Sequence, residues 1–405
     1  MPNCPKSRQA AGLNTTVPTV STNAAIAAIF LTVVGAAGFL VLPVILGAAV
    51  GDLALAADQV GLLGSSLLMG SAVSAIGAAM LVRRLNWRWL AYAALALECI
   101  GFLLSSQVDS YPHIMLPLFL ASCGGGATLS LALTVLSDHP KAERMFGFAL
   151  TMQVAFQVVG LLMLSWFMVP GRLDLCLNVL AGLAVMGLCV VPLLPKHGVV
   201  IATSEHMSAA DILKQPLGLL SLVGCLLFFV NIGAVWAYVE RMGSASEISP
   251  RLLGQALAGG VATGMLGSLA AAWQGRRLGY ALPLAIAVVG TLIALFLMQV
   301  PMTFVEFLLA FALYNFFWNY SLTYQYAVVT SVDQSGRYIA ATPAFHALGG
   351  ALGPIAAAML VTQNSLLPIN YVAGFAVILS LAAFYPATSA SPDSWVNAKR
   401  NRRFS

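Results

Sequence analysis

Charged residues are scarce in this sequence: Asp, Glu, Lys and Arg make up 8% of its 405 residues, against roughly 25% in ordinary soluble domains. Hydrophobic residues make up 60%. A soluble chain of this length has too little interior for that apolar surface, so the composition indicates a membrane protein. The formal net charge is +5, but the basic residues occur singly or in pairs, so we expect no nucleic-acid partner.

Motifs for metal, nucleotide or catalytic chemistry are missing. The six cysteines form no CxxC pair and have no histidines at metal-ligand spacing. We therefore predict neither a zinc site nor a disulfide framework. The glycines of Gly124–Gly126 follow no strand, and no GK[ST] occurs, so they predict close helix approach rather than a phosphate loop. We therefore expect neither an enzyme nor a cofactor.

Long apolar runs are abundant instead. A membrane-crossing helix needs about 20 mostly apolar residues, and twelve segments of the sequence qualify. The first is too long for a signal-peptide core, so we interpret it as a retained span. The expected spans cover 24–47, 60–82, 89–107, 114–136, 145–168, 174–193, 217–239, 253–273, 280–299, 303–328, 338–361 and 368–387.

One pattern occurs twice at an offset of 193 positions. This offset carries Gly61 onto Gly254, Arg83-Arg84 onto Arg276-Arg277 and Gln153 onto His346. Such self-similarity indicates two copies of one unit. The predicted domains are an N-terminal tail (1–23), a six-helix bundle (24–193), a central loop (194–216), a second six-helix bundle (217–387) and a C-terminal tail (388–405).

Basic residues predict the orientation. If the spans alternate across the membrane, only Arg172, Arg241 and Arg251 of the nineteen Lys and Arg residues lie on the side opposite the N-terminus. Cytoplasmic loops carry an excess of Lys and Arg. We therefore expect both termini, the central loop and both tails to be cytoplasmic, in a bacterial-type inner membrane.

The twelve spans, the central loop and the basic pairs after spans two and eight together resemble the major facilitator superfamily. The best local match is Gly275-Arg276-Arg277, the tail of that superfamily's G-x3-D-R-x-G-R-R loop signature, with Arg83-Arg84 in the first copy. Ala272 and Trp273 stand where the signature has Asp and Arg. The fifth-span Gly-Pro antiporter signature is also missing, which disfavours drug efflux.

The resemblance implies an all-α membrane protein of two pseudo-symmetric six-helix bundles. Spans 1, 4, 7 and 10 with 2, 5, 8 and 11 would line a central cavity, and spans 3, 6, 9 and 12 would support it from outside. Rocking of the halves about a midplane site would give alternating access. The two basic loops would act as gating loops.

Polar side chains inside spans are costly and usually face a cavity or one another. Span ten is the richest, and its amides and aromatic rings suit flat or apolar organic substrates. The alternative is that these aromatic residues pack between helices and the amides bond to neighbours. The predicted substrate-binding residues of this span are Tyr314, Asn315, Trp318, Asn319 and Tyr324.

His346 lies eight residues into span eleven, about 12 Å deep at 1.5 Å per residue. Histidine titrates in the range that suits a proton carrier. One interpretation has His346 and Gln153 facing each other across the cavity, with Gln157 a turn further on; the other has a neutral histidine packed between helices. Asn231 in span seven is also a predicted substrate contact.

Glu98 is the one acidic residue at the middle of a span. An ionised carboxylate facing lipid would be costly, so we expect it to be protonated or turned inward. Its place on a support span argues against direct substrate contact, and proton coupling is the functional alternative. Glu240 and Glu306 lie near outer ends of spans, where solvated carboxylates are common, and we assign them no role.

Lys and Arg are missing from mid-membrane depth, which disfavours strongly anionic solutes. The sequence therefore predicts a secondary active transporter of a small neutral, amphipathic or aromatic organic solute, coupled to protons as in a symporter and monomeric in the lipid bilayer. The alternatives are an efflux pump for hydrophobic compounds that exchanges them for protons and, less favoured, a transport-fold receptor. A convergent nucleophile or metal set that would make the chain a membrane enzyme is not evident.

Overall fold

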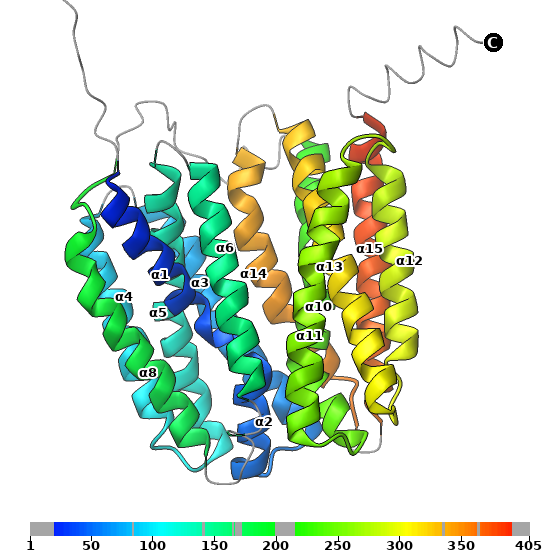
Figure 1. The fold of residues 1–405 in the computed structure, drawn as a ribbon, viewed down its shortest axis with the longest axis horizontal. Coiled ribbons are helices and arrows are strands. Elements are labelled where there is room, and N and C mark those ends of the chain that lie inside the picture. Colours follow the sequence, from blue (N-terminus) through cyan, green and yellow to red (C-terminus); the bar gives the residue numbers. More distant parts are fainter. Residues whose placement is uncertain are drawn as a thin grey trace, which may run out of the picture.

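The computed structural model describes residues 20–82, 85–139, 142–163, 166, 172–198, 215–333, 337–362 and 365–390. This part of the chain is almost entirely helical (Figure 1). The helices of the first half are α1 (Thr22–Leu40), α2 (Leu42–Leu53), α3 (Ala57–Leu81), α4 (Trp87–Ser105), α5 (Tyr111–Ser137), α6 (Ala142–Leu162) and α8 (Leu173–Val190), followed by the short 3₁₀ helix η1 (Val191–Leu193).

The helices of the second half are α10 (Pro216–Ala245), α11 (Pro250–Gln274), α12 (Ala281–Leu297), α13 (Phe304–Val332), α14 (Arg337–Ala358) and α15 (Leu367–Ala390). They gather on one side of the molecule, and the helices of the first half gather on the other (Figure 1). Among the described residues, nine helices are long and apolar enough to cross a membrane. The nine do not include α12, which has 17 residues, or α13 and α14, which carry most of the polar candidates.

The first expected span, 24–47, is divided into α1 and α2. Ser21 caps α1 by accepting a hydrogen bond from the amide of Ala24 (3.2 Å), and the helix ends at Leu40. Pro43 at the start of α2 has no N–H to donate to the carbonyl of Phe39, four residues earlier, so the helix breaks there. The sequence analysis did not include this break, although proline was its visible signal.

Three consecutive glycines of α5 let other helices approach closely, as the sequence predicted. A side chain at Gly124 would collide with the α4 backbone at Ala94, and one at Gly125 would lie 2.8 Å from the carbonyl oxygen of Gly35 in α1. A side chain at Gly126 would collide with Ser71 of α3. The glycines therefore bring α4, α1 and α3 against three faces of one helix.

Candidate functional site

A cavity of about 200 Å³ lies between the two halves of the molecule. Residues of α1, α3, α4 and α5 line it from one half, and residues of α10 and α14 line it from the other. Pockets for drug-sized ligands measure ~300–1,000 Å³, so this cavity suits a small solute. The lining residues on which the argument depends are Phe39, Ser71, Glu98, Phe102, Phe229, His346 and Gly350.

The cavity wall is almost wholly apolar. Apart from Ser71, Ser122, Glu98 and His346, every lining residue is glycine, alanine, leucine or phenylalanine. The hydroxyl of Ser122 already donates to the carbonyl of Leu67. Glu98 from one half and His346 from the other are therefore titratable side chains that face an otherwise apolar cavity.

Glu98 reaches the cavity from α4, which is the third expected span. This corrects the expectation that this span only supports the cavity from outside. Gly125 explains the difference, because a side chain there would lie 3.3 Å from Glu98 Oε1, and the bare glycine leaves the carboxyl room to pass α5. Glu98 is 2% exposed, and its Oε2 has no hydrogen-bond partner among the described residues.

His346 lies on α14, on the opposite side of the cavity. Its ring stacks on Phe229, with 4.0 Å between ring centroids and 14° between planes, and contacts Tyr326 at 5.6 Å. The side chain is 6% exposed, and Nε2 has no hydrogen-bond partner in the part of the chain that the structure describes. Stacking fixes the plane of the imidazole while one ring nitrogen stays free for a solute, a water or a proton.

Gln153 and Gln157 lie on α6 and are not among the cavity-lining residues. The amide of Gln153 donates to the carbonyl of Thr32 in α1 (3.4 Å), and Gln157 is 7% exposed. In this structure the group that lies across the cavity from His346 is therefore Glu98, whereas Gln153 joins two helices of its own half.

Asn231 of α10 and Tyr314 of α13 form a fully buried pair. The Tyr314 hydroxyl donates to Asn231 Oδ1 (3.1 Å), and no described residue bonds to Asn231 Nδ2. Elsewhere on α13, Asn315 Nδ2 donates to the carbonyl of Phe311 (3.0 Å), and Asn319 Nδ2 donates to the carbonyl of Asn315 (3.1 Å). The two asparagines of α13 thus bond to their own helix, and the Asn231–Tyr314 pair keeps two unused donors.

Trp318 belongs to a row of aromatic rings behind the cavity. Its ring meets Phe229 edge-on at 6.5 Å and Trp236 at 6.4 Å, and Trp236 stacks on Phe311 at 6.2 Å. Since Phe229 also stacks on His346, the row connects α13 to the cavity wall through packed rings. Trp318 itself is not one of the lining residues.

Tyr324 packs against the end of α11. Its hydroxyl donates to the carbonyl of Gly275 (3.0 Å), whose φ of +55° follows the last turn of the helix. Arg276 and Arg277 lie over the rings of Tyr280 and Trp273 at 5.4 and 5.5 Å. Tyr324 therefore anchors the second basic loop. Arg83 and Arg84, the corresponding pair, lie outside the described residues.

Tyr324→Phe is expected to destabilise the protein by about 1 kcal/mol, because it removes the hydroxyl that holds the Gly275 carbonyl. The measurement is the midpoint of unfolding in SDS. Tyr371→Phe, at a ring that is 66% exposed on α15, is the control and should leave the midpoint unchanged. Equal midpoints for the two variants would show that the bond contributes nothing.

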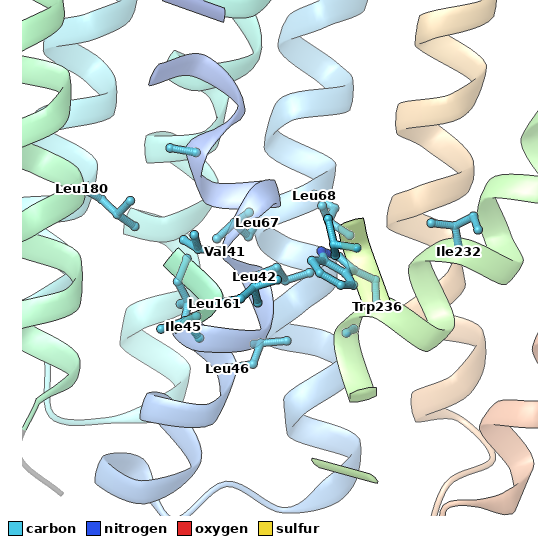
Figure 2. Close-up of a cluster of buried hydrophobic side chains, with 14 of the residues drawn as sticks. Val41, Leu42, Ile45, Leu46, Leu67, Leu68, Leu161, Leu180, Ile232 and Trp236 are labelled. Atoms are coloured by element: carbon cyan, nitrogen blue, oxygen red, sulfur yellow. The ribbon is translucent and has the colours of Figure 1, made fainter. Parts of the chain in front are cut away.

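The interface between the halves is closed at the end where α2 lies. The indole Nε1 of Trp236 in α10 donates to the carbonyl of Phe39 (2.9 Å), which cannot receive its usual helical hydrogen bond because Pro43 stands four residues later. Figure 2 shows Trp236 pointing toward Leu42 and Leu68. Leu68 also lines the cavity, so these packed side chains lie directly beside the cavity wall.

Glu240 and Tyr238 of α10 contact the first half at the same end. A side chain at Gly47 of α2 would lie 3.0 Å from the Glu240 carboxyl carbon, and Glu240 accepts a hydrogen bond from Ser244 (2.6 Å). Glu240 is 3% exposed, so the expectation of a solvated carboxylate is wrong here. The carboxylate of Glu306 is the N-terminal cap partner of Thr303 in α13.

The sequence analysis did not single out the phenylalanines of the cavity wall. Phe39, Phe102 and Phe229 come from three helices, α1, α4 and α10. Every span contains apolar residues all round, so no periodicity distinguishes a ring facing the cavity from one facing lipid. Only the proline four residues after Phe39 gave a local signal.

Comparison with known proteins identifies the fold. No protein-family model and no curated protein sequence matches the chain. Among solved structures, the nucleoside transporter NupG is 14% identical, with a TM-score of 0.71, and the match covers 90% of this chain and 99% of NupG.

Two further structures are similar over nearly their whole length. A D-xylose–proton symporter is 13% identical with a TM-score of 0.71, covering 91% of this chain and 96% of the symporter. A bacterial homologue of the human lysosomal transporter Spinster, in an inward-facing and unoccupied conformation, is 13% identical with a TM-score of 0.66, covering 91% of this chain and 97% of its own. This multi-pass α-helical membrane protein therefore has the fold of the major facilitator superfamily transporters.

Proposed function

We propose that this protein is a secondary active transporter that moves a small amphipathic or aromatic organic solute across the membrane by alternating access, coupled to protons. The observation that carries the proposal is the apolar cavity with Glu98 on one half and His346 on the other. Each has a buried polar atom without a partner. Buried polar groups are normally satisfied, so two open ones facing a shared cavity point to a solute, water or proton there.

The proposal includes the predicted topology. Two six-helix bundles, twelve spans and cytoplasmic termini would place the α2 end at the outer face of a bacterial inner membrane. The packed contacts of Trp236, Tyr238 and Glu240 would then close the outer side, and movement of the halves would open it. We assign His346 and Glu98 to proton coupling because they are the titratable groups of the cavity wall.

The remaining candidates stay predictions. We propose Asn231, Tyr314 and Trp318 as substrate contacts in the state that opens the α2 end. Trp318 packs on Phe229 of the cavity wall, and the Asn231–Tyr314 pair keeps unused donors. The further predicted contacts are Gln153, Gln157, Asn315, Asn319 and Tyr324, and the predicted gating-loop residues are Arg83, Arg84, Gly275, Arg276 and Arg277.

His346→Gln is expected to retain solute exchange between equal concentrations and to lose accumulation driven by a pH gradient, because glutamine keeps a polar side chain but carries no proton in the working range. The measurement uses purified protein in vesicles, with uridine, D-xylose, indole and phenethylamine as solutes. His113→Gln is the control, because His113 is exposed at the start of α5 and bonds to Ser110.

Two outcomes would contradict the proposal. If the wild-type protein accumulates solute to the same level with and without a pH gradient, transport is not coupled to protons. If His346→Gln accumulates solute in a pH gradient as well as wild type does, His346 has no role in proton coupling, although the transport function itself still stands.

Efflux of hydrophobic compounds is the second candidate function, and the apolar cavity wall favours it. It predicts that expression lowers the internal concentration of the compound and raises resistance to it. Uptake predicts the opposite change in internal concentration.

A further inference from the structure

The charge of Glu98 restricts which solute the cavity accepts. An ionised carboxylate without a partner is costly in an apolar space, whereas the neutral acid or a close ion pair is tolerated. Glu98 is 2% exposed, and its Oε2 bonds to no other group of the described residues. The carboxyl group is therefore stable in two forms: carrying its own proton, or facing a positive charge.

The described residues of the cavity wall supply no fixed positive charge. Around Glu98, the lining residues of α1, α3, α5 and α10 carry no titratable group, and α14 contributes only His346. Cys99, the neighbour of Glu98 on α4, is a thiol and is neutral or negative. Within the described part of the chain, the Nε2 of His346 has no hydrogen-bond partner and so does not donate to Glu98. A solute that brings its own positive charge would supply the ion partner that Glu98 lacks.

The other wall residues suit the body of such a solute. Phe39, Phe102 and Phe229 place three aromatic rings on the same cavity as the carboxyl group. Aromatic faces attract organic cations within about 6 Å, most strongly where water is excluded. An apolar or aromatic group with one positive charge would satisfy the rings and the carboxylate together, which a neutral solute does not.

We propose that the solute is a small organic monocation, an amine or quaternary ammonium on an apolar or aromatic body, and that it exchanges with one proton at Glu98. The inference rests on the proposed transport function and replaces the sequence-based preference for a neutral solute. When the cation binds, the O–H bond of Glu98 breaks and its proton leaves to water. When the cation leaves, a proton returns, so the charge in the cavity is the same in both forms.

The first test is equilibrium binding of benzyltrimethylammonium to the purified full-length protein across a pH series. This probe has no proton of its own to lose. Protons and the cation compete for one carboxylate. In the pH range where Glu98 is protonated, the affinity for benzyltrimethylammonium should therefore fall about tenfold for each unit by which the pH is lowered. In weakly buffered solution in that range, a pH-indicator dye should report close to one proton released per cation bound. Binding that is independent of pH and releases no proton would overturn the proposal.

The second test compares variants and a neutral isostere. Glu98→Gln should reduce the affinity for benzyltrimethylammonium about 100-fold or more, as expected for loss of a desolvated charge partner. Neopentylbenzene has the same shape without the charge, and this variant should bind it with the wild-type affinity. Glu98→Asp should keep proton release with weaker binding. Glu247→Gln, at an exposed carboxylate between α10 and α11, should change nothing.

If Glu98→Gln does not fold, the wild-type pH series and proton release still decide the question. Wild-type protein that binds neopentylbenzene as tightly as the cation would overturn the cation class while leaving the cavity as the solute site. Failure of both compounds to bind, together with the absence of any solute flux in vesicles, would count against the transport function itself.

Vesicle flux gives the third test. One cation exchanged for one proton moves no net charge, so a pH gradient should drive accumulation of benzyltrimethylammonium, and a potassium diffusion potential alone should not. Accumulation that follows the potential instead would show uncompensated entry of the cation and would contradict the exchange at Glu98.

Discussion

Gly350→Leu is expected to weaken solute binding ~100-fold and to reduce transport accordingly, while leaving the fold intact. Gly350 lines the cavity on α14, and a side chain added there meets no atom within 4 Å. Leucine therefore enters the cavity itself rather than a helix contact. In a cavity of about 200 Å³, forcing a solute against it should cost about 3 kcal/mol, which lowers the affinity ~100-fold.

The measurement for Gly350→Leu is binding of benzyltrimethylammonium and flux into vesicles, with the unfolding midpoint as the check on the fold. Gly182→Leu is the matched control: it adds the same side chain to the exposed face of α8, where nothing lies within 4 Å. Gly350→Ala should give an intermediate loss. Normal binding by Gly350→Leu at wild-type stability would exclude this cavity as the solute site.

Gly61→Leu should force the α2 end of the interface open. A side chain at Gly61 of α3 would collide with Tyr238 of α10 and lie 2.7 Å from the carbonyl oxygen of Pro354 in α14. Both contacts belong to the other half, so the two halves must separate locally. An overpacking cost of about 1–3 kcal/mol shifts the equilibrium roughly 5- to 150-fold toward the open arrangement.

The readout for Gly61→Leu is the rate at which a polar thiol reagent labels Ala237→Cys, in a chain whose native cysteines are replaced. Ala237 is 1% exposed and lies beside Gly64 of α3, so labelling reports separation at this point. Gly51→Leu is the control at the same end, because a side chain there meets nothing within 4 Å. An unchanged labelling rate in Gly61→Leu would contradict the assignment of this contact to the closed end.

The sequence allowed prediction of the helical membrane fold, because runs of about 20 apolar residues have few other solutions. It also predicted the close approach at Gly124–Gly126. It assigned Glu98 to a supporting span, because the rotation of a helix that is apolar on all sides depends on its neighbours. The space that Gly125 leaves beside Glu98 becomes visible only when α4 and α5 are packed.

Polar residues inside the spans were correctly recognised as unusual, but their partners were not predictable. Tyr324 bonds to a carbonyl of the α11 end, and Gln153 bonds to one of α1. Glu240 is buried against Gly47, although its position near a span end suggested water. In each case the partner is more than 45 positions away along the chain, and spacing within one helix carries no information about it.

The break between α1 and α2 determines what must happen when the α2 end opens. Pro43 cannot give the Phe39 carbonyl its usual helical donor, and in the closed arrangement this carbonyl accepts from Trp236 of the other half as well as from the amide of Val41. Separation of the halves removes the Trp236 bond, and one intramolecular hydrogen bond contributes about 0.5–1.5 kcal/mol net. The Trp236 indole N–H and the Phe39 carbonyl, at the cavity wall, must then bond to water or to the solute, so hydration of this pair accompanies admission of the solute.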